Sequence, residues 1–286
     1  MYKNNDTKNK FAMKIIKNKK TYRNQSLIEL KMVAALNKNC FLKNHQHNCH
    51  IINLLDYFFY QEHLCLVFEL LTENLYQSLK HNHLQGISLN SINFIIKQLL
   101  ESIEHVHSLG IIHCDIKPEN FVVKFDKNKK TFPVLKLIDF GNSRKMDNEG
   151  DNLKNFSGTL CYMAPELFEK KGFNEKVDEW AAGILMYNML TGCNPFNLNS
   201  DSDYKNEIIN TNIDFNMIKN ERLRELNKKL LEKCPNKRIS AKEALDEIKI
   251  IKNDIITRNI FSNINNDKIE NYFNSISKKL NMLSLS

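Results

Sequence analysis

The sequence predicts an α+β protein in which a small antiparallel β lobe is followed by a larger, mostly helical lobe. Two observations carry this prediction. Before residue 72 the apolar residues occur mainly in short runs typical of strands, whereas between residues 88 and 251 they recur mainly at the three- and four-residue spacing of buried helix faces. A chain of 286 residues with 42% hydrophobic residues is large enough to bury such a core.

The predicted β lobe consists of three strands and one helix. Residues 10–18 alternate between two faces, which is typical of a half-buried strand. Apolar residues at helical spacing then predict a helix over 26–36. Two further apolar runs are separated by a polar turn, which predicts an antiparallel hairpin with strands at 51–59 and 63–71.

The larger lobe is predicted to begin with a long helix over 88–109, because its apolar residues recur on one face. Gly110 is suited to end this helix. Two short strands, at 119–125 and 134–140, follow with a polar insert between them. Helical patterns then dominate from residue 172 to about residue 251.

The formal net charge of +8 is concentrated at one end of the chain. Residues 1–31 carry nine Lys or Arg residues against Asp6 and Glu29, and the remainder is close to neutral. No interleaved aromatic residues support base stacking, so we interpret this segment as a solvated basic face and expect no nucleic-acid partner.

The cysteine pattern and the hydropathy pattern both favour an intracellular protein. The seven cysteines are odd in number and scattered, which predicts free thiols in a reducing compartment. The His and Cys residues between 40 and 50 fit no common zinc-binding spacing, and we favour a polar insertion there. The chain has no apolar run long enough for a membrane span and no secretory signal at its N-terminus. We therefore expect a cytoplasmic or nuclear location.

Three short motifs stand in a characteristic order along the chain. They are HCDIKPEN at 113–120, DFG at 139–141 and APE at 164–166. Together with four single residues they resemble the signature of the eukaryotic protein kinases, which implies a bilobal protein-kinase-like fold over residues 1 to about 250. The single residues are Lys14 in FAMK, Glu29 in the first helix, Asp178 in VDEW and Arg238 in CPNKR.

The resemblance implies a transfer of the γ-phosphoryl group of ATP, with Mg²⁺ as the second cofactor. Such a reaction depends on cations and carboxylates held at fixed points. Lys14 is expected to hold the α- and β-phosphates and to pair with Glu29. Asp139 and Asn120 are expected to ligate Mg²⁺, which prefers oxygen ligands. Asp115 is expected to accept or orient the proton of the substrate hydroxyl.

Two further positions indicate which hydroxyl is phosphorylated. Lys117 resembles the lysine of the Ser/Thr-directed kinases, where it contacts the transferred phosphoryl group. Thr159 matches the threonine that bonds the catalytic Asp and Lys. We therefore expect protein substrates that are phosphorylated on Ser or Thr. Met163 stands where proline-directed kinases have Arg, which argues against proline-directed specificity.

The resemblance also divides the chain and outlines a nucleotide pocket. It implies a partial small lobe at 1–68, a hinge at 69–74, a larger lobe at 75–251 and a C-terminal helical tail at 252–286. The residues expected around the adenine and ribose are Ala12, Phe68 as gatekeeper, Glu69 and Leu71 through their backbones, Asn74 and Val122.

The subfamily resemblance is mixed. The segment from 65 to 89 and the HCD motif look like the dual-specificity tyrosine-regulated kinases. The later motifs are similar to the calcium/calmodulin-dependent and calcium-dependent kinases. Glu166 and Arg238 resemble a buried structural ion pair of the family, and Asp178 resembles the anchor of the side chains that link the two lobes.

The sequence departs from the family pattern at two places. No glycine precedes Gly86, so the glycine-rich phosphate loop is missing, and we expect a truncated sequence rather than an enzyme without the loop. The alternative function is a catalytically impaired, nucleotide-binding or scaffold protein with the kinase fold. Cys114 replaces the Arg that pairs with a phosphorylated activation loop, and Asn155 occupies the usual phosphosite. We therefore expect the loop at 142–163 to be competent without phosphorylation.

Overall fold

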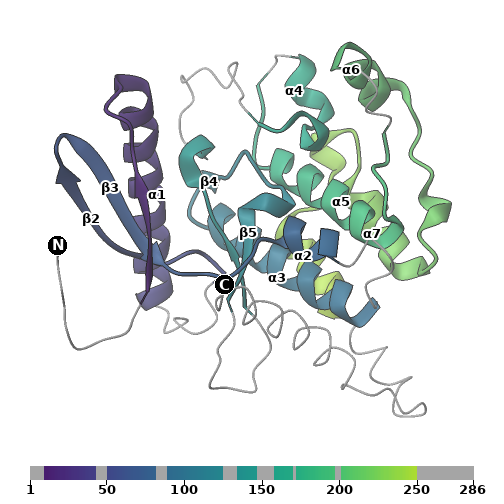
Figure 1. Cartoon of the computed structure of the whole chain (residues 1–286). Helices are drawn as coiled ribbons and strands as arrows, with labels where there is room; N and C mark the ends of the chain where they lie inside the picture. The colour runs from purple at the N-terminus through teal and green to yellow at the C-terminus, as the bar shows by residue number, and fades with distance from the viewer. Residues whose placement is uncertain are drawn as a thin grey trace, which may run out of the picture.

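The computed structural model describes residues 10–42, 50–81, 89–124, 134–146, 158–169, 172–196 and 201–249. It confirms the predicted division into a small antiparallel sheet with one helix and a larger helical part. Figure 1 shows β2, β3 and α1 together on one side of the molecule and helices α2 to α7 on the other, with β4 and β5 toward the middle.

The small lobe contains a three-stranded antiparallel sheet in the order β1-β3-β2. The strands are β1 (Phe11–Ile15), β2 (Leu54–Tyr60) and β3 (His63–Glu69), which confirms the predicted strand and hairpin. The two-residue turn between β2 and β3 holds Gln61 and Glu62 at φ angles of 45° and 64°. Positive φ at both residues gives the twist that a tight hairpin needs.

Helix α1 (Lys20–Leu42) packs against one face of this sheet. Its residues Val33 and Leu36 are buried together with Leu64 and Leu66 of β3. The helix begins six residues before the predicted start of 26–36. Its first turn is polar and exposed, so the apolar periodicity that marks the buried face is absent there.

The larger lobe is built around α5 (Lys176–Thr191), of which twelve residues are buried. Helices α3 (Leu89–His107) and α7 (Glu221–Leu230) both contact it. The other described helices are α2 (Leu75–His81), α4 (Pro165–Glu169), α6 (Asp201–Asn210) and a helix over 241–249.

Two short strand pairs position the loops that carry the sequence motifs. Strand β4 (Ile111–Ile112) pairs with β7 (Arg144–Lys145), and β5 (Phe121–Lys124) pairs with β6 (Val134–Leu137). The segment 113–120 joins β4 to β5, and the segment 138–143 joins β6 to β7. Because each strand pair joins one end of both segments, the two loops are held side by side.

One expectation about the cysteines is wrong. Cys40 is disulfide-bonded, so the expectation of free thiols does not hold for this residue. Spacing along the chain could not reveal this pairing, because it depends on where the end of α1 lies in space. The described free cysteines are Cys65, Cys114, Cys161, Cys193 and Cys234.

Several other expectations fall outside the described residues. They are the start of the helix at Ser88, the polar insert after β5, the phosphosite position Asn155 and the tail at 252–286. Among the helices that are described, none is both long and apolar enough to cross a membrane.

Candidate active site

Lys14 joins three elements at the cleft side of the sheet. Its Nζ lies 3.0 and 2.8 Å from the two carboxylate oxygens of Glu29 in α1 and 3.2 Å from Oδ1 of Asp139, which follows β6. Burial lowers the pKa of Lys14, but the two carboxylates outweigh it and raise this pKa above its ordinary value. Lys14 is therefore charged at neutral pH and links the small lobe to the 138–143 segment.

The backbone around Asp139 permits this close approach. Asp139 has a φ of 60°, in the left-handed region that Asp tolerates better than most residues. A Cβ at Gly141 would lie 3.3 Å from Oδ1 of Asp139 and 3.4 Å from Nε2 of Gln25, so a side chain here would crowd both of these side chains. Phe140 is fully buried and meets the ring of His113 edge-on, with centroids 4.9 Å apart.

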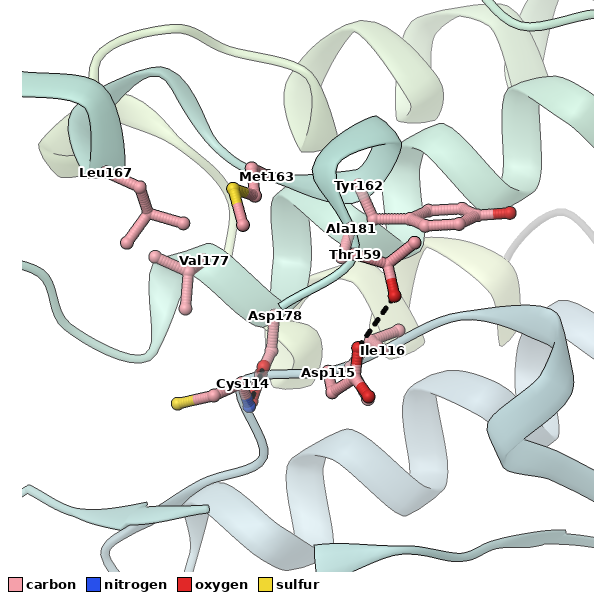
Figure 2. Close-up of a pocket in the computed structure, with 10 residues that line it drawn as sticks. All are labelled: Cys114, Asp115, Ile116, Thr159, Tyr162, Met163, Leu167, Val177, Asp178 and Ala181. Atoms are coloured by element: carbon pink, nitrogen blue, oxygen red, sulfur yellow. Dashed lines mark hydrogen bonds between the residues drawn. The ribbon is translucent and has the colours of Figure 1, made fainter. Parts of the chain in front are cut away.

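Asp115, Lys117 and Thr159 form a closed set of contacts. The Nζ of Lys117 lies 2.8 Å from Oδ2 of Asp115 and donates to Oγ1 of Thr159 over 2.9 Å. The Thr159 hydroxyl in turn donates to Oδ1 of Asp115 over 3.1 Å, the contact drawn in Figure 2. Asn120 donates through Nδ2 to the backbone oxygen and Oδ2 of Asp115, at 2.8 and 3.1 Å. This network holds the Asp115 carboxylate in one orientation.

Asp178, at the start of α5, fixes the backbone beside Asp115. Its Oδ2 accepts the N–H of His113 over 2.8 Å and its Oδ1 accepts the N–H of Cys114 over 2.9 Å. Cys114 has a φ of 67°, a left-handed conformation that is uncommon for such a residue. Burial and the charge of Asp178 raise the pKa of the Cys114 thiol well above its ordinary value, so it is not a thiolate.

A small pocket opens beside Asp115 and Thr159. Figure 2 shows Met163, Leu167 and Val177 lining it on the side away from the Asp115 carboxylate. The pocket is therefore polar at the end nearest the Asp115 carboxylate and apolar beyond it.

A buried ion pair between Glu166 and Arg238 lies next to the start of α5. Arg238 contacts the Glu166 carboxylate through both terminal nitrogens, at 2.7 and 3.0 Å, and donates to the carbonyl of Lys176 over 2.6 Å. Its guanidinium also lies over the Trp180 ring, 5.0 Å from the centroid. The pair therefore ties α4 to the start of α5.

The residues expected around the base of the nucleotide lie along one edge of the cleft. Ala12 is opposite Phe68 in the β1–β3 ladder, and Val122 forms an isolated bridge with Asn74. The N–H of Glu69 donates to the carbonyl of Asn53 over 3.1 Å, so a backbone contact of Glu69 with adenine stays a prediction.

Asn74 has a local role at the start of α2. Its Oδ1 accepts the N–H of Gln77 over 2.8 Å, and its own N–H donates to Oε1 of Gln77 over 3.1 Å. This reciprocal cap satisfies two backbone groups at the helix start. A contact of Asn74 with a ribose stays a prediction.

The comparison with known families agrees with the site. The chain matches the family model described as "Protein kinase domain" over residues 1–248. The chain belongs to the protein kinase family. In this kinase domain, the 113–120 segment, which carries Asp115, Lys117 and Asn120, is the expected catalytic loop.

Three curated kinases illustrate the similarity. The chain is 32% identical over 207 residues to "Probable serine/threonine-protein kinase yakA" of Dictyostelium discoideum, covering 72% of this chain and 14% of that protein. It is 35% identical over 181 residues to "Probable serine/threonine-protein kinase dyrk2" of the same organism, covering 63% and 19%. It is 33% identical over 191 residues to human "Dual specificity tyrosine-phosphorylation-regulated kinase 4", covering 67% and 34%. The matches thus span between 14% and 34% of these relatives' length.

Sequence reasoning missed one residue of the site's support. Glu179 is buried beside Asp178 and contacts His107 at 3.2 Å. The available signal was two adjacent carboxylates in the first turn of an otherwise apolar helix.

Proposed function

We propose that this chain transfers the γ-phosphoryl group of ATP to Ser or Thr hydroxyls of protein substrates, with Mg²⁺. The contact of Lys14 with both Glu29 and Asp139 is the observation that supports this most directly. It sets a cation and a carboxylate next to each other across the cleft, as binding of a metal-bound polyphosphate requires.

The side chains present fit these two cofactors. Asp139 offers a carboxylate, and Asn120 uses its amide nitrogen on Asp115, which leaves its amide oxygen as an acceptor. Both are oxygen ligands of the kind that Mg²⁺ prefers. Lys14 would hold the α- and β-phosphates, and the bound Mg²⁺ would neutralise phosphate charge.

The catalytic loop supplies the acid–base and electrostatic chemistry. Asp115 would accept the proton of the substrate hydroxyl, because Lys117 and Thr159 orient its carboxylate and it lines the pocket. Lys117 would stabilise the charge on the phosphoryl group during transfer. The Thr159 hydroxyl holds both side chains at once, and this lysine–threonine arrangement supports Ser/Thr over Tyr substrates.

The test measures Mg·ATP-dependent phosphate transfer to a mixed library of Ser, Thr and Tyr peptides. The wild-type chain is expected to label Ser and Thr peptides, and Asp139→Asn and Asp115→Asn are each expected to reduce transfer by at least about 100-fold. Glu225→Gln, which removes an exposed carboxylate far from the cleft, serves as the control. A wild-type chain that binds Mg·ATP but transfers no phosphate would favour the impaired-kinase alternative.

We also propose the domain limits and the location given by the sequence. The segment 70–73 between β3 and α2 is irregular, which supports a hinge at 69–74 between lobes at 1–68 and 75–251. A helical tail at 252–286 and a cytoplasmic or nuclear location are further proposals from the sequence.

A further inference from the structure

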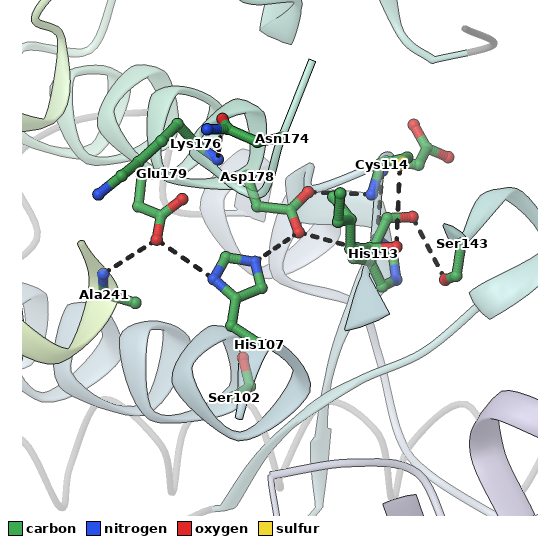
Figure 3. A network of polar contacts seen from close by, with 12 residues as sticks. Ser102, His107, His113, Cys114, Ser143, Asn174, Lys176, Asp178, Glu179 and Ala241 are labelled. Carbon is green, nitrogen blue, oxygen red and sulfur yellow. Dashed lines mark hydrogen bonds and ion pairs between the residues drawn. The ribbon is translucent and has the colours of Figure 1, made fainter. Parts of the chain in front are cut away.

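His107, the last residue of α3, lies between two carboxylates of α5. Its Nε2 is 2.9 Å from Oδ2 of Asp178, and its Nδ1 is 3.2 Å from Oε1 of Glu179. Figure 3 shows the ring bridging the two side chains. The side chain of His107 is 11% exposed, and those of Asp178 and Glu179 are 2% and 1% exposed. All three groups are therefore nearly removed from water.

This geometry requires both ring nitrogens to carry a proton. An ionised carboxylate only accepts hydrogen bonds, so a bare ring nitrogen facing either one would place two lone pairs together. Burial lowers the pKa of His107, but Glu179 and Asp178 outweigh it and raise this pKa to about 10. His107 is thus an imidazolium at neutral pH.

Two described side chains on the neighbouring 113–120 segment are neutral at neutral pH. Burial lowers the pKa of His113 and raises that of the Cys114 thiol, so both side chains of the catalytic loop are neutral. The helix over 241–249 contributes the N–H of Ala241, which donates to Oε1 of Glu179 over 3.0 Å. Arg144 of β7 donates to the carbonyls of Asn142 and Ser143, and its charge acts to lower the pKa of the Cys114 thiol.

The network ends on the backbone of the catalytic loop. Asp178 accepts a hydrogen bond from the Nε2–H of His107. At the same time it accepts hydrogen bonds from the backbone N–H groups of His113 and Cys114. Cys114 is strained at a φ of 67°, and Asp115 follows it directly. The position of the Asp115 carboxylate therefore depends on the position and orientation of the Asp178 side chain.

We propose that Glu179 is a positioning residue of the phosphotransfer reaction. By accepting the Nδ1–H of His107 it keeps both ring N–H groups donating, so that Asp178 retains a cationic partner while it holds the backbone beside Asp115. This role rests on the proposed phosphotransfer function. Glu179 contacts no substrate and acts only through His107 and Asp178.

The role predicts a specific pH dependence. A pKa raised in the folded state stabilises the native network fully below the ordinary histidine pKa of about 6.5, and this contribution is lost as the pH rises through the folded value of about 10. Without the Glu179 charge the folded pKa falls, so the window in which His107 is charged ends at a lower pH. The loss of activity should therefore grow between pH 6 and pH 9.

The experiment compares the intact chain with Glu179→Gln, and uses Glu175→Gln as the matched control. Glu175 lies at the same end of α5 but makes no side-chain cap contact. The ring nitrogens of His107 are titrated by NMR, and kcat and the KM for ATP are measured from pH 6 to pH 9. We expect Glu179→Gln to lower the His107 pKa by at least about two units, and to leave kcat within about twofold at pH 6 but at least about fivefold lower at pH 9. The KM for ATP should not change, because Lys14 and Asp139 are untouched.

Each outcome decides a separate question. A constant ratio of kcat between variant and wild type at every pH would overturn the positioning role, since a purely structural defect removes active protein equally at all pH values. If Glu179→Gln does not fold, the wild-type titration still decides, because a His107 that titrates near 6.5 or below contradicts the charged bridge. If wild-type His107 titrates near 10 but the chain transfers no phosphate, the proposed function fails, and the catalytic role of Glu179 fails with it.

Discussion

Thr159 shows how one side chain can couple two catalytic groups. Its hydroxyl accepts from Lys117 and donates to Asp115, so both of its hydrogen-bonding directions are used. The two partners carry opposite charges and already contact each other at 2.8 Å. Thr159 therefore adds orientation rather than charge.

Thr159→Ala should lower kcat with little change in the KM for ATP. The substitution removes two hydrogen bonds to charged groups, each worth about 1.5–3 kcal/mol. Even one of them corresponds to roughly a 10- to 150-fold loss in kcat. Steady-state kinetics on a Ser peptide measure the effect. Thr159→Ser keeps the hydroxyl and should retain most of the activity, and equal losses in both variants would contradict this role.

Helix α5 organises the site from within the larger lobe. Its first turns place Asp178 under the catalytic loop, Glu179 against His107 and Trp180 under Arg238. Further along, Gly183 allows α7 to approach, and the carbonyl of Gly183 accepts the Asn227 amide over 2.8 Å. Helix α5 therefore combines the polar contacts of its first turns with close packing against α7.

Gly183→Ala should destabilise the protein, although alanine favours helices. An added Cβ would lie 2.8 Å from Cδ2 and 2.9 Å from Cγ of Leu231. Overpacking of this kind costs about 1–3 kcal/mol, which exceeds the gain in helix propensity of about 1 kcal/mol. Urea unfolding should show a lower midpoint. In a Leu231→Ala background the two shortest contacts are absent and the one with Cβ of Leu230, at 3.0 Å, remains, so Gly183→Ala should there destabilise the protein less. A stabilised single variant would refute the clash.

Long-range ion pairs join segments that are far apart in the sequence. Glu166 and Arg238 are 72 residues apart and link α4 to the chain after α7, while Lys14 and Asp139 are 125 residues apart and link the two lobes. The first pair is buried and the second is half exposed. The buried Glu166–Arg238 pair is therefore expected to stabilise the fold, whereas the Lys14–Asp139 pair is accessible to a ligand.

Glu166→Gln should lower the free energy of unfolding substantially. Arg238 has no exposed side-chain surface, so the variant leaves a buried guanidinium without its counter-charge. Breaking such a pair costs about 3–5 kcal/mol, and we expect the lower end because three backbone carbonyls still accept from Arg238. Asp246→Asn breaks an exposed pair with Lys249 and should leave the unfolding midpoint unchanged. Equal effects of the two variants would argue against the buried pair.

Much of the secondary structure was predictable because its signals are local. The alternation of residues 10–18 and the periodicity of 88–109 correspond to β1 and α3. The start of α1 was missed because it is polar and exposed, and α2 was not predicted because seven residues are too few to show a period. The spacing of Asn74 and Gln77 was the available signal for α2.

The chemistry of the site could also be predicted from the sequence. The order of the motifs indicated a kinase, and the residue types indicated the groups that phosphoryl transfer needs. The contacts themselves could not be predicted residue by residue. These contacts depend on how the helices and strands, among them β1, α3 and α5, pack against one another. They are the contacts of Lys14 with Asp139, of Thr159 with Lys117 and of Glu179 with His107. Residue identity and local period are encoded within a few positions of the chain. The distance between side chains 42 to 125 residues apart is set by the packing of the core between them, and only the folded structure contains it.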